Sequence, residues 1–228
     1  MLDTKGFTDK DSKKPEYRKL YEELPFIEAY AKHTDMRIAK DGPELAIGAK
    51  RDGQQDWDIH GKAQLDFLIA RGLKPDNFLL DFGCGTGRLA CKAIPYLNSH
   101  RYVGVDISQD AIDLCVARHP DRGACFVHSE DGGMPPPGWP RDYIFAHSVL
   151  THLPPDCVHA LFKDLAAMEF GQFFFTYKES KQAQRSGLKQ FQYPKAWLIN
   201  TAKLYGLKAE ADPMEWPAGQ KTMRVVKA

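Results

Sequence analysis

The sequence predicts a doubly wound α/β fold, in which a parallel sheet is covered by helices on both faces. From residue 78 onward, short apolar runs alternate with segments of helical periodicity, which is typical of such folds. The first run lies within residues 77–90 (NFLLDFGCGTGRLA) and leads directly into a glycine-rich turn. Polar residues also follow several of the apolar runs, where strands of this fold present their ligand-binding ends.

The N-terminal part is predicted to be a helical extension. Tyr17, Leu20, Tyr21 and Leu24 recur at helical spacing until Pro25 interrupts them. A loose segment is expected from there to about residue 56, and a helix over residues 58–71 follows. Gly72 is suited to the left-handed conformation that ends such a helix.

Seven strands are predicted in the remainder of the chain, and their residue ranges are 78–82, 101–106, 124–127, 143–148, 172–177, 207–211 and 221–227. Helices are expected between them, from about residue 87 to Pro95, after Ser108, over residues 154–168 and over residues 194–205. The apolar stripe of the helix after Ser108 is predicted to comprise Ile112, Cys115 and Val116.

Composition limits the function classes. The 228 residues carry a formal net charge of +1, which argues against a partner such as duplex nucleic acid. The five cysteines are odd in number and show no C-x-x-C spacing, so neither a disulfide framework nor a metal site is expected. No secretory signal and no apolar run of membrane-spanning length is found, so a cytoplasmic protein without a membrane partner is expected. The oligomeric state stays open.

The glycine turn has the form D-x-G-x-G-x-G, with Asp81, Gly83, Gly85 and Gly87. A dinucleotide turn would need a third glycine where Arg88 stands, which disfavours a nicotinamide-dependent oxidoreductase. A Walker loop would need G-K-[ST], which is absent. The turn can hold a nucleotide-like ligand, or it can be only a tight corner between strand and helix.

Acidic residues follow the next two strands. Asp106 stands where a carboxylate can accept both hydroxyls of a ribose, although it can also be a solvated strand end. Glu130 or Asp131 can accept from an adenine amino group, although a polar loop before two glycines explains them as well.

Four stretches in this order, LLDFGCGTGRLA, YVGVDIS, HSEDG and YIFAHSVLTHLPP, resemble the class I S-adenosylmethionine (SAM)-dependent methyltransferases. The resemblance covers roughly residue 57 to the end. It implies a mostly parallel seven-stranded sheet with an antiparallel last strand, a SAM-binding domain over 57–228, and a possible lid over 1–56. The LKPGG turn common before the fifth strand is replaced by MEFGQ, which leaves the acceptor class open.

The resemblance also implies roles for residues. Asp81 and the turn formed by Gly83, Cys84, Gly85 and Gly87 would meet the methionine part of SAM. Asp106 would hold the ribose hydroxyls, Ile107 would pack on adenine, and Glu130 or Asp131 would reach the adenine amino group. The backbone near Ala146 and His147 would lie close to the methionine ammonium.

His152 is the predicted catalytic residue. The loop after the fourth strand faces the methyl group in this fold, and a histidine there can take the proton of an acceptor hydroxyl. With an ordinary imidazole pKa, the rate would then rise with pH near 6–7. Alternatively, His152 only hydrogen-bonds to a loop carbonyl.

The predicted function is transfer of a methyl group from SAM to a small-molecule acceptor, most simply to a hydroxyl oxygen. The alternatives are N-methylation of a small molecule or a protein, and a SAM-binding partner protein without catalysis. The basic stretch over residues 178–189 is expected to be mobile, either closing over an acceptor or merely solvated. Trp57, Tyr193 and Trp197 can contact ligands or only anchor helices.

Overall fold

The computed structural model describes residues 3–46, 53–120, 123–135, 138 and 140–228. Its centre is a seven-stranded sheet in the order β3-β2-β1-β4-β5-β9-β8. Its strands are β1 (Leu79–Phe82), β2 (Tyr102–Asp106), β3 (Cys125–His128), β4 (Tyr143–Ala146), β5 (Gln172–Lys178), β8 (Leu207–Trp216) and β9 (Gln220–Lys227). Only β9 runs against its neighbours in this sheet. The predicted fold class is confirmed, including the antiparallel last strand.

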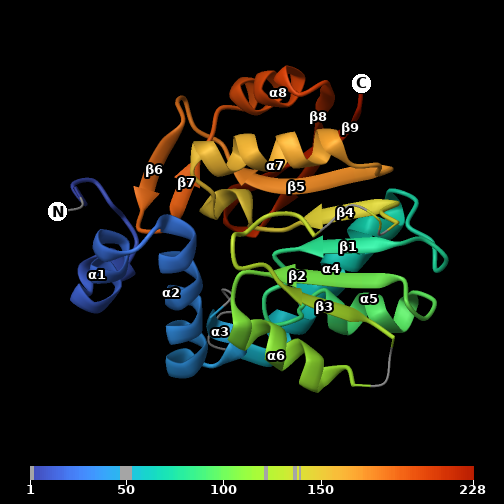
Figure 1. The fold of residues 1–228 in the computed structure, drawn as a ribbon, viewed down its shortest axis with the longest axis horizontal. Coiled ribbons are helices and arrows are strands. Elements are labelled where there is room, and N and C mark those ends of the chain that lie inside the picture. The colour runs from blue at the N-terminus through green and yellow to red at the C-terminus, as the bar shows by residue number, and fades with distance from the viewer. Residues whose placement is uncertain (1–2, 47–52, 121–122, 136–137, 139) are drawn as a thin grey trace.

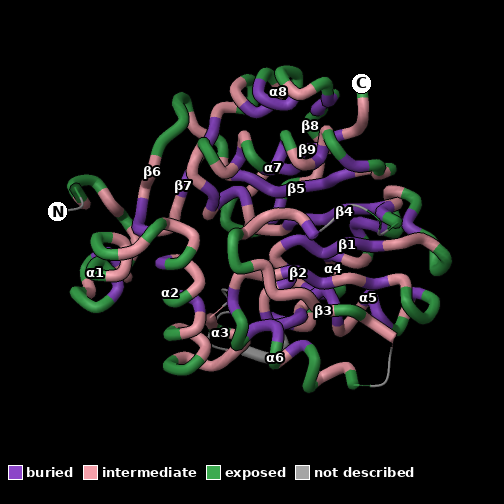
Figure 2. Tube along the Cα trace, in the orientation of Figure 1, coloured by how far each residue is buried: buried purple, intermediate pink, exposed green. Residues whose placement is uncertain are grey.

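Helices cover both faces of this sheet (Figure 1). One face carries α4 (Gly53–Ala70), α5 (Ala90–Tyr96) and α6 (Gln109–Arg118), and the other carries α7 (Pro155–Ala167) and α8 (Lys195–Leu204). Successive side chains of a strand point to opposite faces, so Leu79 packs in the layer of α4 and Leu80 in that of α7. Figure 2 shows that burial is concentrated in the strands between these layers.

Local signals set several boundaries as predicted. Gly72 has a φ of +96°, and the amide of Leu73 returns to the carbonyl of Leu68, which closes α4. The Ser108 hydroxyl accepts the amide of Ala111 and caps α6. Val116, however, is 52% exposed and does not belong to the inner stripe of α6.

The strand order reverses beside β1, whose neighbours are β2 on one side and β4 on the other. The chain moves outward from β1 to β3 and then crosses back to β4. The connections leaving the carboxyl ends of β1 and β4 therefore diverge, which opens a crevice for a ligand.

The N-terminal extension is more ordered than the sequence indicates. It contains the short η1 (Asp11–Lys13), α1 (Pro15–Glu23), α2 (Phe26–Asp41) and α3 (Pro43–Ala46). The prediction of a loose segment after Pro25 is wrong for α2. The inner face of α2 faces a cavity instead of packing into the core, and the residues of this face that line the cavity are Ile27, Tyr30, Thr34 and Arg37. This face is mixed in polarity, so it gives no clear apolar periodicity.

The basic stretch after β5 forms a hairpin of β6 (Gln184–Gly187) and β7 (Gln190–Gln192), beside α1 and α2 in Figure 1. The sequence did not predict these two strands. Asp9 accepts the amide of Leu188, and Thr8 donates its amide to the carbonyl of Ser186. These contacts come from residues about 180 positions earlier in the chain.

The predicted boundary between residues 56 and 57 falls inside α4. No helix in the described ranges combines the length and apolar character needed to cross a membrane.

Candidate active site

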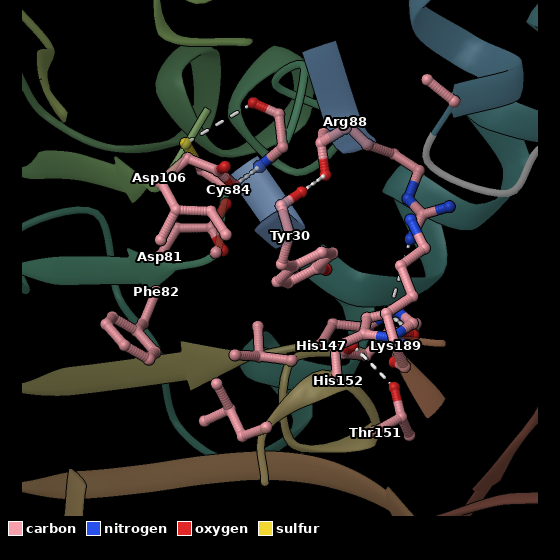
Figure 3. A pocket seen from close by; sticks show the side chains of 18 of the residues that line it. Tyr30, Asp81, Phe82, Cys84, Arg88, Asp106, His147, Thr151, His152 and Lys189 are labelled. Carbon is pink, nitrogen blue, oxygen red and sulfur yellow. Dashed lines mark hydrogen bonds between the residues drawn. The ribbon is translucent and has the colours of Figure 1, made fainter. Parts of the chain in front are cut away.

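A cavity of about 620 Å³ lies at the carboxyl ends of β1, β2 and β4. This volume is within the range of roughly 300–1,000 Å³ typical of ligand pockets. The glycine turn and Asp106 line one side, and α2, His152 and the tip of the β6–β7 hairpin line the other. In Figure 3, the ring of Tyr30 points into the space between Asp81 and Asp106 on one side and His152 and Lys189 on the other.

Glycine is required at two places in the turn. Gly83 has a φ of +77°, and an added Cβ would meet Cγ2 of Val149 at 2.3 Å. Gly87 has a φ of +90°, and an added Cβ would lie 3.1 Å from Sγ of Cys115. Gly83, Cys84 and Gly85 line the cavity, whereas Gly87 does not belong to the lining and packs beneath the turn.

Asp106 connects the end of β2 with the glycine turn. One carboxylate oxygen accepts the amide of Gly85 at 2.8 Å, and the other accepts the amide of Ser108 at 3.0 Å. Burial raises the pKa of Asp106, and these two amides oppose that shift. A carboxylate has about four lone-pair sites, so each oxygen can still accept from a ligand hydroxyl.

Asp81 is buried at the end of β1 and accepts the Tyr102 hydroxyl at 2.7 Å. Burial raises its pKa to about 7, and the hydrogen bond from Tyr102 opposes the shift. Asp81 lines the cavity, so a cationic ligand group nearby would favour its charged form.

Of the residues predicted to contact adenine, one lines the cavity and two do not. Ile107 lines the cavity together with Ser129 and Gly132. Glu130 and Asp131 are exposed and lie outside the lining. Asp131 accepts the amide of Gly133 and the hydroxyl of Ser129 within its own loop. The geometry therefore adds no support to a ligand role for these two acids.

A group of buried polar side chains lies between α4, the turn and β4. His147 and Arg88 are 3.4 Å apart through Nδ1 and Nη2, and Gln64 lines the same part of the cavity. His147 Nε2, Arg88 Nε and Gln64 Oε1 are buried without a partner among the described residues. Burial lowers the pKa of His147 well below its usual value. Unpaired buried polar atoms are costly, which points to a polar ligand group here.

Ser148 follows β4 with a φ of +63°, an uncommon value for a residue other than glycine. Its amide donates to the Thr176 hydroxyl, and its own hydroxyl donates to Gln220. These contacts from β5 and β9 hold the chain in a costly conformation beside the cavity.

His152 lies in η2 (Leu150–His152) and lines the cavity. Its Nδ1 is 2.6 Å from the carbonyl oxygen of Lys189, so this nitrogen must carry the proton. The carbonyl contact considered in the sequence analysis is therefore present, and it leaves Nε2 with a lone pair. Burial, with the positive charge of Lys189, lowers the pKa of His152 to about 3, which corrects the expected value near 6–7.

Two residues face His152 across the cavity: Tyr30, which sequence reasoning missed, and Lys189, which it named only within the basic stretch over residues 178–189. The ring of Tyr30 on α2 lies 5.3 Å from that of His152, between centroids. Lys189 Nζ lies 5.1 Å from the centroid of Tyr30. Burial, followed by the charge of Arg37, lowers the pKa of Lys189 to about 8. No local pattern indicated Tyr30, because it comes from a helix that the sequence did not predict, and the basic stretch alone did not single out Lys189.

Three aromatic residues that could have contacted a ligand do not line the cavity. Trp57 is buried, with the guanidinium of Arg118 5.2 Å from its ring. Tyr193 stacks on Trp197 at 4.8 Å between ring centroids. Each therefore anchors a helix.

Residues 80–168 match the family model of a methyltransferase domain. The matched segment contains the glycine turn, Asp106, His147 and His152. The match therefore covers the side of the cavity that the sheet forms, and it omits α2 and the hairpin.

Solved structures share the fold. Magnesium protoporphyrin IX methyltransferase from Synechocystis, crystallised with bound SAM, has a TM-score of 0.66 at 15% identity, covering 90% of this chain and 98% of that one. A chain of the Haloferax volcanii complex between the Trm112 methyltransferase activator and the putative methyltransferase has a TM-score of 0.63 at 15% identity. This match covers 85% of the present chain and 96% of that one. A TehB-like SAM-dependent methyltransferase from Corynebacterium glutamicum has a TM-score of 0.58 at 17% identity, and the match covers 86% of the present chain and 99% of that one.

Proposed function

Residues 80–168 match a methyltransferase domain and the fold is that of solved SAM-dependent methyltransferases, and from this premise we propose that the chain is a class I SAM-dependent enzyme that methylates a small-molecule acceptor at a hydroxyl oxygen. One observation carries the proposal: a single cavity joins the glycine turn and Asp106 to a neutral histidine with a free nitrogen. SAM, when bound, supplies a methyl group on a sulfonium that is already activated for transfer.

The residues of the cavity fit this cofactor. Asp106 offers free lone pairs for a ribose diol, and Ile107 offers an apolar surface beside it. The unpartnered atoms of Arg88 and His147 suit the charged amino-acid end, and Arg88 would be able to bind its carboxylate. Gly83 lines the cavity, and its lack of a side chain lets the turn pass close to Val149.

His152 would act on the acceptor side. Nδ1 is held by the carbonyl of Lys189, which fixes the ring and leaves Nε2 to accept a proton from a hydroxyl. A ring with a pKa of about 3 is neutral at physiological pH, so Nε2 is always available. The same low pKa makes it a weak base, so most of the rate would come from holding the acceptor in line.

An amine acceptor is the second candidate, and the low pKa of His152 is the observation that favours it. An amine loses its proton to water before the transfer and needs no strong protein base. Because the substitution of His152 affects the two acceptor classes differently, it separates them.

The test is a screen of phenols, sugars and amines with SAM, in which release of S-adenosylhomocysteine (SAH) is the readout. With a hydroxyl acceptor, His152→Ala should lower turnover about 10²-fold, the low end of the range for general acid–base catalysis. Affinity for SAH, measured by calorimetry, should hardly change. Full activity of the variant would remove His152 from the mechanism.

Cofactor identity is tested separately by calorimetry with SAH and NAD. We expect SAH to bind and NAD to bind far more weakly. Tighter binding of NAD would contradict the proposal.

A further inference from the structure

We propose that the acceptor carries an anionic group, a carboxylate or a phosphate, which Lys189 and Lys178 hold on the His152 side of the cavity. This inference rests on the proposed function and names the chemical class of the substrate. It starts from the place of the two lysines in the cavity lining.

The tip of the β6–β7 hairpin fixes the position of Lys189. Its carbonyl bonds to Nδ1 of His152, and the preceding amide, of Leu188, donates to Asp9 at 2.8 Å. Arg185 donates to the carbonyls of Gly187 and Leu188. A turn held from three directions aims one lysine into the cavity. These contacts indicate that the fold holds Lys189 in this position, because a solvent-exposed loop would need none of them.

Lys189 forms no ion pair within the described residues, and Asp11, Asp9 and Asp106 act on it only through their more distant charges. Its nearest acids are occupied: Asp11 binds Lys14, His33 and Arg37, and Asp9 accepts the amides of Ser12 and Leu188. Lys178, at the end of β5, lines the same region, and the ion pairs of the described chain include neither lysine. Both lysines are half-buried, and a partly desolvated ammonium without an ion-pair partner is costly, so an anionic ligand would lower that cost.

The charged side chains are unevenly distributed in the cavity. Asp81 and Asp106 lie with Arg88 on the side of the glycine turn, whereas Lys189 lies near His152 (Figure 3), and the charge of Lys178 also acts on His152. A cationic sulfonium suits the acidic side, and an anionic acceptor suits the basic side. Burial is the main cause of the low pKa of His152, and the charges of Lys189 and Lys178 add to it, so an anion bound between the lysines would offset that second contribution.

The inference is tested with SAH-loaded protein and matched pairs of probes. The carboxylate pairs are 4-hydroxybenzoate with 4-hydroxybenzamide and hexanoate with hexanamide; the phosphate pair is phenyl phosphate with phenol. We expect at least one anion to bind about tenfold more tightly than its neutral partner, the effect of one charge-assisted contact. The pair that shows the preference distinguishes carboxylate from phosphate.

Three variants test whether Lys189 causes the preference for an anion. Lys189→Met should abolish the preference, Lys189→Arg should retain it, and Lys203→Gln, an exposed lysine on α8, should leave it unchanged. Affinity for SAH should stay within about twofold in all three, which also shows that each variant is folded. The inference is overturned if no pair shows a preference, or if Lys189→Met keeps it. Failure of the wild type to bind SAH would instead overturn the proposed function, and this inference with it.

Discussion

Asp106 illustrates how one side chain serves the fold and the site together. Its two oxygens hold the amides of Gly85 and Ser108, so the carboxylate ties the glycine turn to the start of α6. The remaining lone pairs face the cavity. A ligand that uses them meets a carboxylate that is already oriented, which lowers the entropic cost of binding.

Asp106→Ala should weaken SAH binding by about 2–4 kcal/mol, because a carboxylate that accepts two ribose hydroxyls is removed. The variant should also have a lower melting temperature without ligand, because the amides of Gly85 and Ser108 lose their acceptor. Asp113→Ala, an exposed site on α6, is the control. Calorimetry with unchanged affinity in Asp106→Ala would contradict the ribose assignment.

The low pKa of His152 predicts an unusual pH dependence. Because the ring stays neutral down to about pH 3, its availability as a base does not change across the ordinary imidazole range. The ratio of wild-type to His152→Gln turnover should therefore be constant between about pH 5.5 and 7.5. Taking the ratio cancels the titration of other groups, including Asp81. A ratio that rises through pH 6–7 would show that His152 titrates normally.

At the scale of elements, the glycine turn tolerates added side chains poorly. It must pass Val149 without a side chain at Gly83 and place the Gly85 amide on Asp106. These two requirements act two positions apart. A change at Gly83 should therefore affect both stability and binding.

Gly83→Ala should lower the free energy of unfolding by more than the roughly 1–2 kcal/mol that a left-handed conformation costs an ordinary residue. The excess comes from the contact of the new Cβ with Val149 at 2.3 Å. Gly206→Ala is the matched control, because Gly206 has a φ of +71° with nothing within 4 Å. Urea denaturation measures both. Equal losses of unfolding free energy in the two variants would show that the turn accommodates the new Cβ without cost. SAH affinity should fall only in Gly83→Ala.

On the whole-molecule scale, the cavity lies between the N-terminal extension and the sheet. The Ser108 hydroxyl that caps α6 also donates to Asp35 on α2 at 2.5 Å, and Arg118 on α6 binds Glu44 on α3. The extension is therefore bonded to the domain at the edge of the site. We expect both to unfold in one transition.

His33 allows that expectation to be tested by pH. Burial lowers its pKa to about 3, so its contribution to stability is present above pH 6.5 and is lost as pH falls toward 3. His33→Gln should therefore show a shallower loss of stability between pH 6.5 and 5, by at most about 1.4 kcal/mol per pH unit.

The readout is the global transition in urea, followed by tryptophan fluorescence. Asp81 acts with the opposite sign, since its pKa of about 7 makes stability fall as pH rises from about 4 through 7. It is present in both proteins and cancels in the comparison. A pH slope unaffected by His33→Gln would show that the extension unfolds separately.

Elements with a strong local signal could be predicted. Four residues of α7, Val158, Leu161, Phe162 and Leu165, recur at helical spacing and are all buried. The cap at Ser108 and the turn at Gly72 also formed as predicted. In contrast, α2 was missed because a helix that lines a cavity presents polar residues on its inner face.

The sequence by itself determined the α/β class, the seven strands with the antiparallel last strand implied by the resemblance, the glycine turn and the position of Asp106. These follow from local periodicity and from residues that are adjacent in the chain. Only the tertiary structure decided what covers the other side of the cavity: Tyr30 from α2, Lys189 from the hairpin, and the pKa of His152. The physical reason is that burial and charge at a point depend on segments distant in sequence, such as Asp9 and Lys189, and no local pattern records their meeting.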